Sequence, residues 1–352
     1  MNVFRNAAVI SMSLVAALWS VATPSWGSPR TLELYEEAVA LTRDAAGHCR
    51  AHFTVSPEHR SRFEEHLAAL ARELNARHGA IPDVEFSEQH PSTDTLAADP
   101  AGGAFRDAGG QLVFRPAGHG ALLQNLEETR GDLVFVKNID NVAVNRLRPE
   151  TTRWSRALVG LAAELRSRAE TLRDRLAEPA DIGAEADALA FVREALGEAD
   201  APATRAELCA RLDRPLRVCG MVPNTGEPGG GPFWVRGRDG RVSRQVVEAA
   251  QVDSRSAGQA GIVARATHFN PVFFACSLRG GGRAYPLANY VDADAAIVTR
   301  KGAAGRPLLA LESPGLWNGA MAEWNTVFVE VPLAIFNPVK TVLDLLRPEH
   351  QA

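Results

Sequence analysis

Short apolar segments alternate with stretches of helical periodicity along most of the chain. Residues 133–136 form a continuous apolar run, which is typical of a strand that is covered on both faces. Apolar residues recur at helical spacing from Phe63 to Leu74, after Ser56 and before Gly79, so we expect a capped helix there. We expect further helices over 31–43, 154–176 and 339–346, and further strands over 52–55, 84–86, 111–115, 216–222, 233–236, 242–247, 295–299, 308–311 and 327–331. This alternation predicts one α/β domain with a mixed sheet.

The N-terminal segment differs from the rest of the chain. Arg5 precedes an apolar stretch over residues 7–22, and small residues follow near Gly27. From Met1 to Gly27 this is the outline of a secretory signal peptide, and the apolar stretch is too short to predict a membrane span. A start site placed upstream of a shortened gene explains the same pattern, so both interpretations stay open. We therefore expect a leader over residues 1–29 and one folded domain over residues 30–352.

Composition narrows the class of protein. The 352 residues are 46% apolar, as in ordinary globular proteins, and carry a formal net charge of −4. Basic and acidic residues are interspersed, which argues against a nucleic-acid binder with a basic face. The four cysteines lie far apart and form no Cys-x-x-Cys pair, so we expect buried free thiols rather than a zinc or redox motif. Spacing alone leaves a disulfide open.

Two polar motifs flank the apolar run. Gly118 and Gly120 enclose His119 at the start of a predicted short helix, where the backbone can approach a flat ligand closely. A plain turn fits the same residues. Asn138 and Asp140 follow the strand, and ligands of open α/β sheets bind beyond the carboxyl ends of the strands. A carboxylate there suits Mg²⁺, which one or two carboxylates hold together with phosphate oxygens; a capped turn is the alternative.

Later segments add further candidates. The loop over residues 224–234 has three consecutive glycines and one ionisable group, Glu227, and is either a lid over a sugar or phosphate or a connector. Lys340 begins the predicted last helix, where a cation could meet phosphate, although a surface lysine fits equally. Four polar side chains at the ends of apolar segments could bind sugar hydroxyls, namely Glu248, Gln251, His268 and Asn270.

The order of these motifs is more specific than any one of them. The chain resembles nucleotidyltransferases of the UDP-glucose pyrophosphorylase type, which have comparable Gly-His-Gly, Asp-Asn-Leu, Glu-x-x-Gln-Val-Pro and Pro-Val-Lys-Thr segments in the same order. From about Arg30 to the C-terminus it resembles even more closely a bacterial family known only as domain of unknown function 4301. The phrases that carry this second resemblance are Phe53-Thr-Val-Ser-Pro-Glu-His-Arg60, Phe86-Ser-Glu-Gln-His-Pro-Ser-Thr-Asp-Thr95, Arg217-Val-Cys-Gly-Met221, the Gly-Glu-Pro-Gly-Gly-Gly-Pro-Phe-Trp loop and Leu316-Trp-Asn-Gly-Ala-Met321.

The resemblance implies a GT-A-like three-layer α/β sandwich and a reaction. A nucleotidyl group would pass from a nucleoside triphosphate (NTP) to a sugar 1-phosphate with Mg²⁺ as cofactor, so the expected partners are these substrates or a sugar nucleotide. Neither nucleic acid nor a stable membrane association is expected. The resemblance implies that Asp140 and Lys340 are catalytic, with Asp140 as the metal ligand. It places the nucleotide at Gly118, His119, Gly120 and Asn138, and the sugar and its phosphate at Glu227, Glu248, Gln251, His268 and Asn270.

One feature of both families is missing. Their members open with a Gly/Ser-rich loop and an arginine on the first strand of the sheet, and this loop wraps the triphosphate. No such phrase precedes Gly118, so we expect a truncated domain whose sheet lacks its first strand. The chain is then either an enzyme that needs this loop or a non-catalytic relative that binds a sugar nucleotide. Because NTPs are cytoplasmic, a working enzyme is expected in the cytoplasm, with export through the leader as the alternative.

Overall fold

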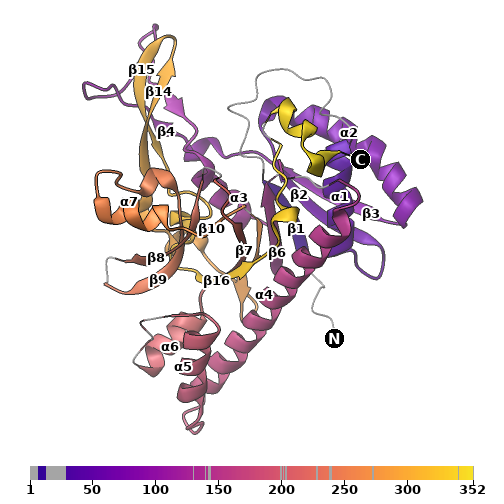
Figure 1. Cartoon of the computed structure of the whole chain (residues 1–352), viewed down its shortest axis with the longest axis vertical. Helices are drawn as coiled ribbons and strands as arrows, with labels where there is room; N and C mark the ends of the chain where they lie inside the picture. The colour runs from indigo at the N-terminus through magenta and orange to yellow at the C-terminus, as the bar shows by residue number, and fades with distance from the viewer. Residues whose placement is uncertain are drawn as a thin grey trace.

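An eight-stranded mixed sheet forms the centre of the protein (Figure 1). This computed structural model describes residues 7–12, 29–129, 131–138, 140–141, 144–198, 200, 202, 204–226, 229–237, 240–271, 273–339 and 341–351. The strands run in the order β3 (Ile81–Ser87), β2 (His48–Thr54), β1 (Ala7–Met12), β6 (Leu133–Asn138), β11 (Phe273–Ser277), β7 (Leu216–Pro223) and β16 (Asn325–Glu330), and β10 (His268–Phe269) pairs with the end of β7. β10 and β11 run antiparallel to their neighbours, whereas the other pairs are parallel. The predicted α/β class with a mixed sheet is confirmed.

β1 consists of residues that the sequence assigns to a leader. It runs parallel to β2 on one side and to β6 on the other, with Val9 opposite both Ala51 and Phe135. The prediction of a sheet without its first strand is therefore not confirmed. The rest of the expected leader before Pro29, residues 1–6 and 13–28, lies outside the described residues.

Helices cover one face of the sheet. α1 contacts β1 and β2, α2 contacts β3, and the long helix α4 crosses β6, β11 and β7 before it reaches α5 and α6 (Figure 1). The other face carries the short helix α3 together with 3₁₀ turns and loops. The helices are α1 (Pro29–Thr42), α2 (Pro57–His78), α3 (Leu123–Glu127), α4 (Arg148–Ala177), α5 (Ala184–Glu194), α6 (Arg205–Leu212) and α7 (Ala257–Ala264).

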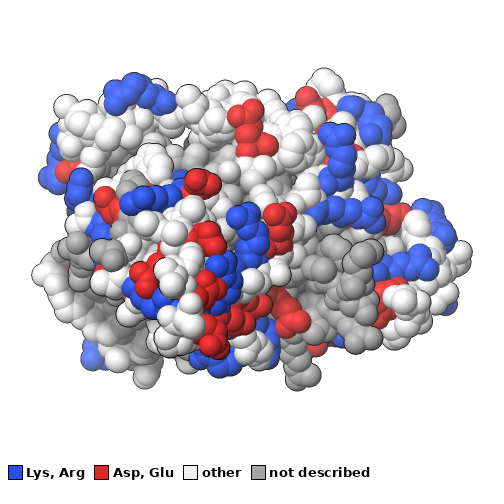
Figure 2. All heavy atoms as spheres, turned by 90° about the horizontal axis from the view of Figure 1, so that it is seen from below, with Lys and Arg blue, Asp and Glu red and all other residues white. Residues whose placement is uncertain are grey.

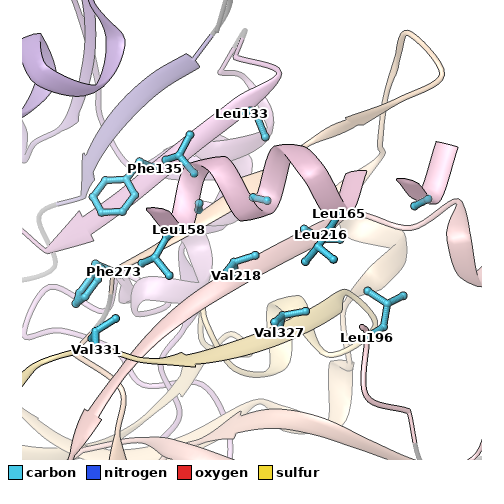
Figure 3. Close-up of a cluster of buried hydrophobic side chains, with 14 of the residues drawn as sticks. Leu133, Phe135, Leu158, Leu165, Leu196, Leu216, Val218, Phe273, Val327 and Val331 are labelled. Carbon is cyan, nitrogen blue, oxygen red and sulfur yellow. The ribbon is translucent and has the colours of Figure 1, made fainter. Parts of the chain in front are cut away.

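The side chains of β6 belong to two separate cores, because successive residues of a strand point to opposite faces. Leu133 and Phe135 pack in the core under α4, where Leu158 of that helix lies close to β6 and β11 (Figure 3). Val134 and Val136 pack in the core of the opposite face. The prediction that this apolar run is a strand covered on both faces is confirmed.

In the described part of the chain, four two-stranded sheets lie around the main sheet. They are β4 (Thr95–Leu96) with β5 (Phe114–Arg115), β8 (Gly231–Arg236) with β9 (Val242–Val247), β12 (Arg279–Gly280) with β13 (Arg283–Ala284), and β14 (Ile297–Ala303) with β15 (Arg306–Glu312). The β8–β9 pair joins two of the predicted strands in a hairpin, and Gly240 between them has a φ of 80°, which favours glycine. β14 and β15 form a ribbon that projects at the upper left of Figure 1.

The predicted helices are confirmed where the periodicity is long and the ends are marked. α2 begins after Ser56, and Gly79 ends it in a left-handed conformation. By contrast, α6, α7 and β11 were not predicted. Each of them is short, and a short apolar run does not distinguish a strand from a helix.

The predicted last helix over residues 339–346 is wrong. Val342–Leu346 is a 3₁₀ turn, which a capping box between Thr341 and Asp344 begins. Leu343 and Leu346 are exposed, so few apolar contacts support a longer helix at this place. A short helix without tertiary packing is marginal.

All four cysteines are free. Cys49, Cys219 and Cys276 are buried, whereas Cys209 is half-buried. Burial raises the pKa of the Cys219 thiol to about 11 and raises that of Cys276 as well. The expectation of buried free thiols is thus confirmed for three of the four.

The surface mixes charges of both signs. Figure 2 shows lysine and arginine next to aspartate and glutamate over much of the face seen from below. Among the described residues, no helix combines the length and the apolar character that crossing a membrane requires.

Truncation of Leu158 should destabilise the protein, because this α4 side chain is 1% exposed in the main core. We expect Leu158→Ala to lower the free energy of unfolding by about 2–5 kcal/mol. Ile182, in the loop between α4 and α5, is 94% exposed. Ile182→Ala should therefore change the free energy of unfolding by less than about 0.5 kcal/mol. Urea denaturation measures the free energy of unfolding of both variants. Equal losses would contradict the assignment of Leu158 to the main core.

Candidate functional site

The carboxyl ends of β1 and β6 lie side by side where the order of the strands reverses. From β1 the chain continues to β2 and β3 on one side, whereas β6 joins β1 on the other. In open α/β sheets a crevice forms outside such a reversal, and ligands bind there. The predicted site residues that follow β6 therefore lie at the expected edge of the sheet.

The residues after β6 contact the segment that precedes Lys340. Val339 donates its backbone N–H to the carbonyl of Asp140 at 2.9 Å, and Asn337 donates its N–H to Asn141 Oδ1 at 2.8 Å. The Asp140 residue is only 9% exposed. Lys340 itself lies outside the described residues. We call this group the strand-end cluster: Asn138, Asp140, Asn141, Asn337 and Val339.

The Gly-His-Gly corner packs against the segment that follows β15. Gly118 has a φ of 73°, which favours glycine. A Cβ on Gly120 would lie 2.1 Å from the carbonyl oxygen of Pro314, so this close backbone approach also requires glycine. Between them, His119 Nδ1 accepts the N–H of Leu316 at 3.0 Å. The two glycines thus serve the packing of the chain on itself.

Glu248 and Gln251 meet the corner from a different part of the sequence. Glu248 Oε1 lies 3.1 Å from His119 Nε2. Glu248 donates its N–H to Gln251 Oε1 at 3.0 Å, and its carboxylate accepts the N–H of Gln251 in a capping box. Asn318 Nδ2 donates to the same Gln251 oxygen at 2.8 Å. We call this group the corner cluster: Gly118, His119, Gly120, Glu248, Gln251, Trp317 and Asn318.

The remaining predicted residues have different surroundings. His268 Nε2 lies 2.9 Å from Glu330 Oε2 at the end of β16, and the described contacts join His268 to neither cluster. Asn270 is buried, and its backbone N–H donates to the carbonyl of Gly230 at 2.9 Å. Glu227 lies outside the described residues.

Aromatic and glycine contacts connect the two clusters. The rings of Phe269 and Phe336 lie 5.3 Å apart between centroids, and Phe336 precedes Asn337 of the strand-end cluster. A Cβ on Gly230 would lie 3.4 Å from Glu248 Cγ, and one on Gly229 would lie 2.4 Å from the Phe269 ring. The described part of the Gly-rich loop therefore lies between the clusters.

Sequence reasoning assigned no role to three side chains that shape this region. Lys137 Nζ lies 2.7 Å from both carboxylate oxygens of Glu37, and both residues are buried. Trp317 stacks on His119 with 3.9 Å between ring centroids, and Asn318 binds Gln251. The available signal was the phrase Leu316-Trp-Asn-Gly, in which a polar and an aromatic residue precede a glycine.

A cavity of about 620 Å³ borders the corner on a different side. Gly120, Gln124 and Glu127 line it, as do Ser313 and Pro314. Of the predicted site residues that the structure describes, Gly120 alone reaches this cavity. Because the convergent polar contacts belong to the two clusters, we assign the candidate site to the clusters rather than to the cavity.

Oxygen donors that suit Mg²⁺ lie at the carboxyl end of β6. Asp140 supplies a carboxylate, and the buried Oδ1 of Asn138 has no hydrogen-bond partner among the described residues. Those residues contain no group of three or more His, Cys, Asp or Glu that could hold a metal unaided. Mg²⁺ in nucleotide sites is bound through one or two carboxylates and the substrate phosphates. The donors therefore fit an ion that arrives with a phosphate.

Comparisons with known proteins agree with this fold. A family model described as "Domain of unknown function (DUF4301)" matches residues 28–351. Two structures of UDP-glucose pyrophosphorylase variants from Leishmania major, each in complex with UDP-glucose, are similar to the chain, with TM-scores of 0.51 and 0.53 and identities of 15% and 16%. Each alignment covers 98% of this chain and 65% of the other, and at such identity it shows the fold alone. No curated protein matches the chain.

Adding a methyl group at Gly120 should destabilise the corner, because it meets the Pro314 backbone. We expect Gly120→Ala to lower the free energy of unfolding by about 1–3 kcal/mol. Gly160 is the matched control, since it lies within α4 and a Cβ added there would have nothing within 4 Å. Gly160→Ala should stabilise the protein by roughly 0.5–1 kcal/mol. Thermal unfolding measures the stability of both variants. If Gly120→Ala stabilised the protein, the close approach of the Pro314 carbonyl to Gly120 would be disproved.

Removing one partner of the buried Lys137–Glu37 pair should cost more than removing both. Lys137→Met leaves the Glu37 carboxylate buried without its cation, and we expect a loss of about 3–5 kcal/mol. The double variant Lys137→Met, Glu37→Met leaves no buried charge and should lie within about 1 kcal/mol of the wild type or above it. Chemical denaturation tests this, and additive losses would refute the pairing.

Proposed function

The chain belongs to the family described as "Domain of unknown function (DUF4301)", and we propose that it is a sugar-nucleotide nucleotidyltransferase with a GT-A-like fold. It would transfer a nucleotidyl group from an NTP to a sugar 1-phosphate and release pyrophosphate. Residues 30–352 would form the nucleotidyltransferase-like domain, with β1 as one strand of its sheet. The mixed sheet with its reversal at β1 and β6 supports this proposal, as does the similarity to UDP-glucose pyrophosphorylases.

One observation carries the proposal. Val339, the residue before Lys340, is bonded to the carbonyl of Asp140 at the carboxyl end of β6. The acidic strand end and the late Pro-Val-Lys segment are far apart in the sequence, yet they meet at the edge of the sheet where phosphates bind in such folds. This contact is what a shared phosphate site at Asp140 and Lys340 requires.

In the proposed reaction a phosphate oxygen of the sugar 1-phosphate attacks the α-phosphorus of the NTP. A new P–O bond forms on the α-phosphorus. The bond opposite to it, between the α-phosphorus and the bridging oxygen of the β-phosphate, breaks, and pyrophosphate leaves. Such a transfer asks little covalent chemistry of the protein, so positioning and charge neutralisation supply most of the acceleration. Lys340 would offset phosphate charge, while Gly118 and Gly120 would meet the base through their backbone atoms.

The strand end would also hold the cofactor. Asp140 and the Oδ1 of Asn138 would provide oxygen ligands for Mg²⁺. When bound, Mg²⁺ neutralises charge on phosphate oxygens. Glu248, Gln251 and Asn270 would lie on the sugar side. The contacts from Glu248 through Gly230 to Asn270 support this grouping, whereas His268 would act at most from the rim.

A sugar-nucleotide-binding protein without turnover is the second candidate. The sequence before Gly118 has no Gly/Ser-rich phrase with an arginine to wrap a triphosphate. Loss of one such backbone donor costs on the order of 100-fold in rate. An active enzyme would work in the cytoplasm, where NTPs are available. Export of a binding protein through the signal-like leader would have to leave β1 attached, because β1 belongs to the main sheet.

A pyrophosphate-release assay tests the proposal directly. With Mg²⁺, glucose 1-phosphate and each of the four NTPs in turn, the wild-type chain should release pyrophosphate. Asp140→Asn should reduce this activity by about 100-fold or more, because it removes the charged ligand of the metal. Asp174→Asn is the control, since this α4 side chain is 75% exposed and pairs with its neighbour Arg173. It should leave the rate within about twofold of the wild type.

Calorimetry separates the two candidates. Heat of binding with UDP-glucose in the presence of Mg²⁺, without pyrophosphate release from any NTP, would support the binding protein. A folded wild-type chain that binds neither an NTP nor UDP-glucose contradicts both candidates.

A further inference from the structure

Other parts of the protein contact the His119 ring at both nitrogens, on one face and at one edge. Its Nδ1 accepts the N–H of Leu316 at 3.0 Å, and its Nε2 lies 3.1 Å from Glu248 Oε1. One ring face stacks on Trp317 at 3.9 Å between centroids, with an interplanar angle of 27°. A Cβ on Gly315 would lie 2.6 Å from His119 Cε1, so backbone also covers that edge. Little of the ring is left for a ligand.

The bond from Leu316 fixes the protonation of this ring. A backbone N–H can only donate, so Nδ1 must present its lone pair and cannot carry a proton. The proton of the neutral ring is then on Nε2, the atom that faces the Glu248 carboxylate. Acid–base work by His119 would first have to break the contact with the Leu316 backbone.

Glu248 is also held by Gln251. Its backbone N–H donates to Gln251 Oε1 at 3.0 Å, and its carboxylate accepts the Gln251 N–H. Its Oε1 is buried and lies 3.1 Å from His119 Nε2 without the geometry of a hydrogen bond, whereas the side chain as a whole is 24% exposed. The carboxylate therefore has one part committed to the protein and another part that can meet a ligand.

The segment that carries the Leu316 donor is anchored independently. Arg217 of β7 is fully buried, and its Nη1 donates to the carbonyl of Trp317 at 2.6 Å. Arg217 Nε also donates to Thr326 Oγ1 of β16 at 2.9 Å. Because both strands belong to the main sheet, His119 is held on the sheet through this segment rather than through its own short helical turn.

We infer that His119 is a positioning residue, which holds the Glu248 carboxylate toward the sugar and does not contact the nucleotide. This inference rests on the proposed function for the sugar side of the site and corrects the role that the family resemblance implies for His119. An ionised carboxylate can only accept hydrogen bonds. Aimed in this way, Glu248 accepts from hydroxyl groups of the sugar 1-phosphate and leaves the NTP unaffected.

The first experiment reads the ring directly. A long-range ¹H–¹⁵N correlation spectrum of the ¹⁵N-labelled protein distinguishes a protonated from an unprotonated ring nitrogen. The signals that disappear in His119→Gln belong to this ring among the nine histidines. We expect a single neutral form with the proton on Nε2. A ring protonated on Nδ1, alone or together with Nε2, overturns the inference.

The second experiment uses two amide variants as a matched pair. Glutamine places an N–H donor near the position of Nε2, whereas the shorter asparagine cannot reach Glu248. His119→Asn should raise the KM for glucose 1-phosphate about tenfold, because the carboxylate then loses the N–H group that faces it, and His119→Gln should raise it less than about threefold. Neither variant should change the KM for the NTP. An equal effect of His119→Asn on both substrates overturns the inference.

Glu248→Gln is the control that tests whether His119 affects sugar phosphate binding through Glu248. If His119 acts through Glu248, the combination His119→Asn with Glu248→Gln should weaken sugar phosphate binding no more than Glu248→Gln alone. Independent, additive losses would contradict the inference. For a chain without turnover, calorimetric affinities for UTP and for glucose 1-phosphate replace the KM values. Absence of binding by a wild type that shows the expected ring spectrum would refute the proposed function and not the ring assignment.

Discussion

The hydrogen bond from the Leu316 backbone to His119 Nδ1 is the contact on which the corner cluster depends. It joins the turn before α3 to the segment after β15, and it places Trp317 and Asn318 beside Glu248 and its capping partner. The bond can form because the carbonyl of Pro314 approaches Gly120 more closely than any side chain would permit. Since the donor is a backbone N–H, the same contact fixes both the path of the chain and the chemical state of the imidazole.

In the strand-end cluster, the nearby lysine Lys137 is already neutralised by a buried carboxylate. Lys137 is the cation nearest in sequence to Asp140 and Asn138, but both carboxylate oxygens of Glu37 hold it in a buried pair. A lysine that is neutralised in this way contributes little to binding a phosphate. Under the proposed function, positive charge for a phosphate would therefore come from another group, and the segment bonded to the Asp140 carbonyl immediately precedes Lys340 in the sequence.

Local patterns in the sequence predicted elements better than they predicted contacts. The capped periodicity of α2 and the apolar run of β6 were sufficient, because each of these signals arises from the element itself. The pairing of His119 with Glu248 could not be read in the same way, because it joins turns that lie far apart in the chain. The role of Trp317 depends likewise on packing that no spacing reveals. The motifs thus identified which segments matter, and tertiary structure determined what each side chain does.

The antiparallel strand β11 explains why motifs from opposite ends of strands meet at one edge. In a parallel sheet only carboxyl ends reach the ligand edge, so a motif that precedes a strand would lie on the far side. β11 runs against β6, and its first residue, Phe273, lies opposite Lys137 near the end of that strand. Asn270, which precedes β11, is thereby brought to the same edge as Asp140. Because neither β11 nor its direction has a clear signal in the sequence, this convergence could be established only from the fold.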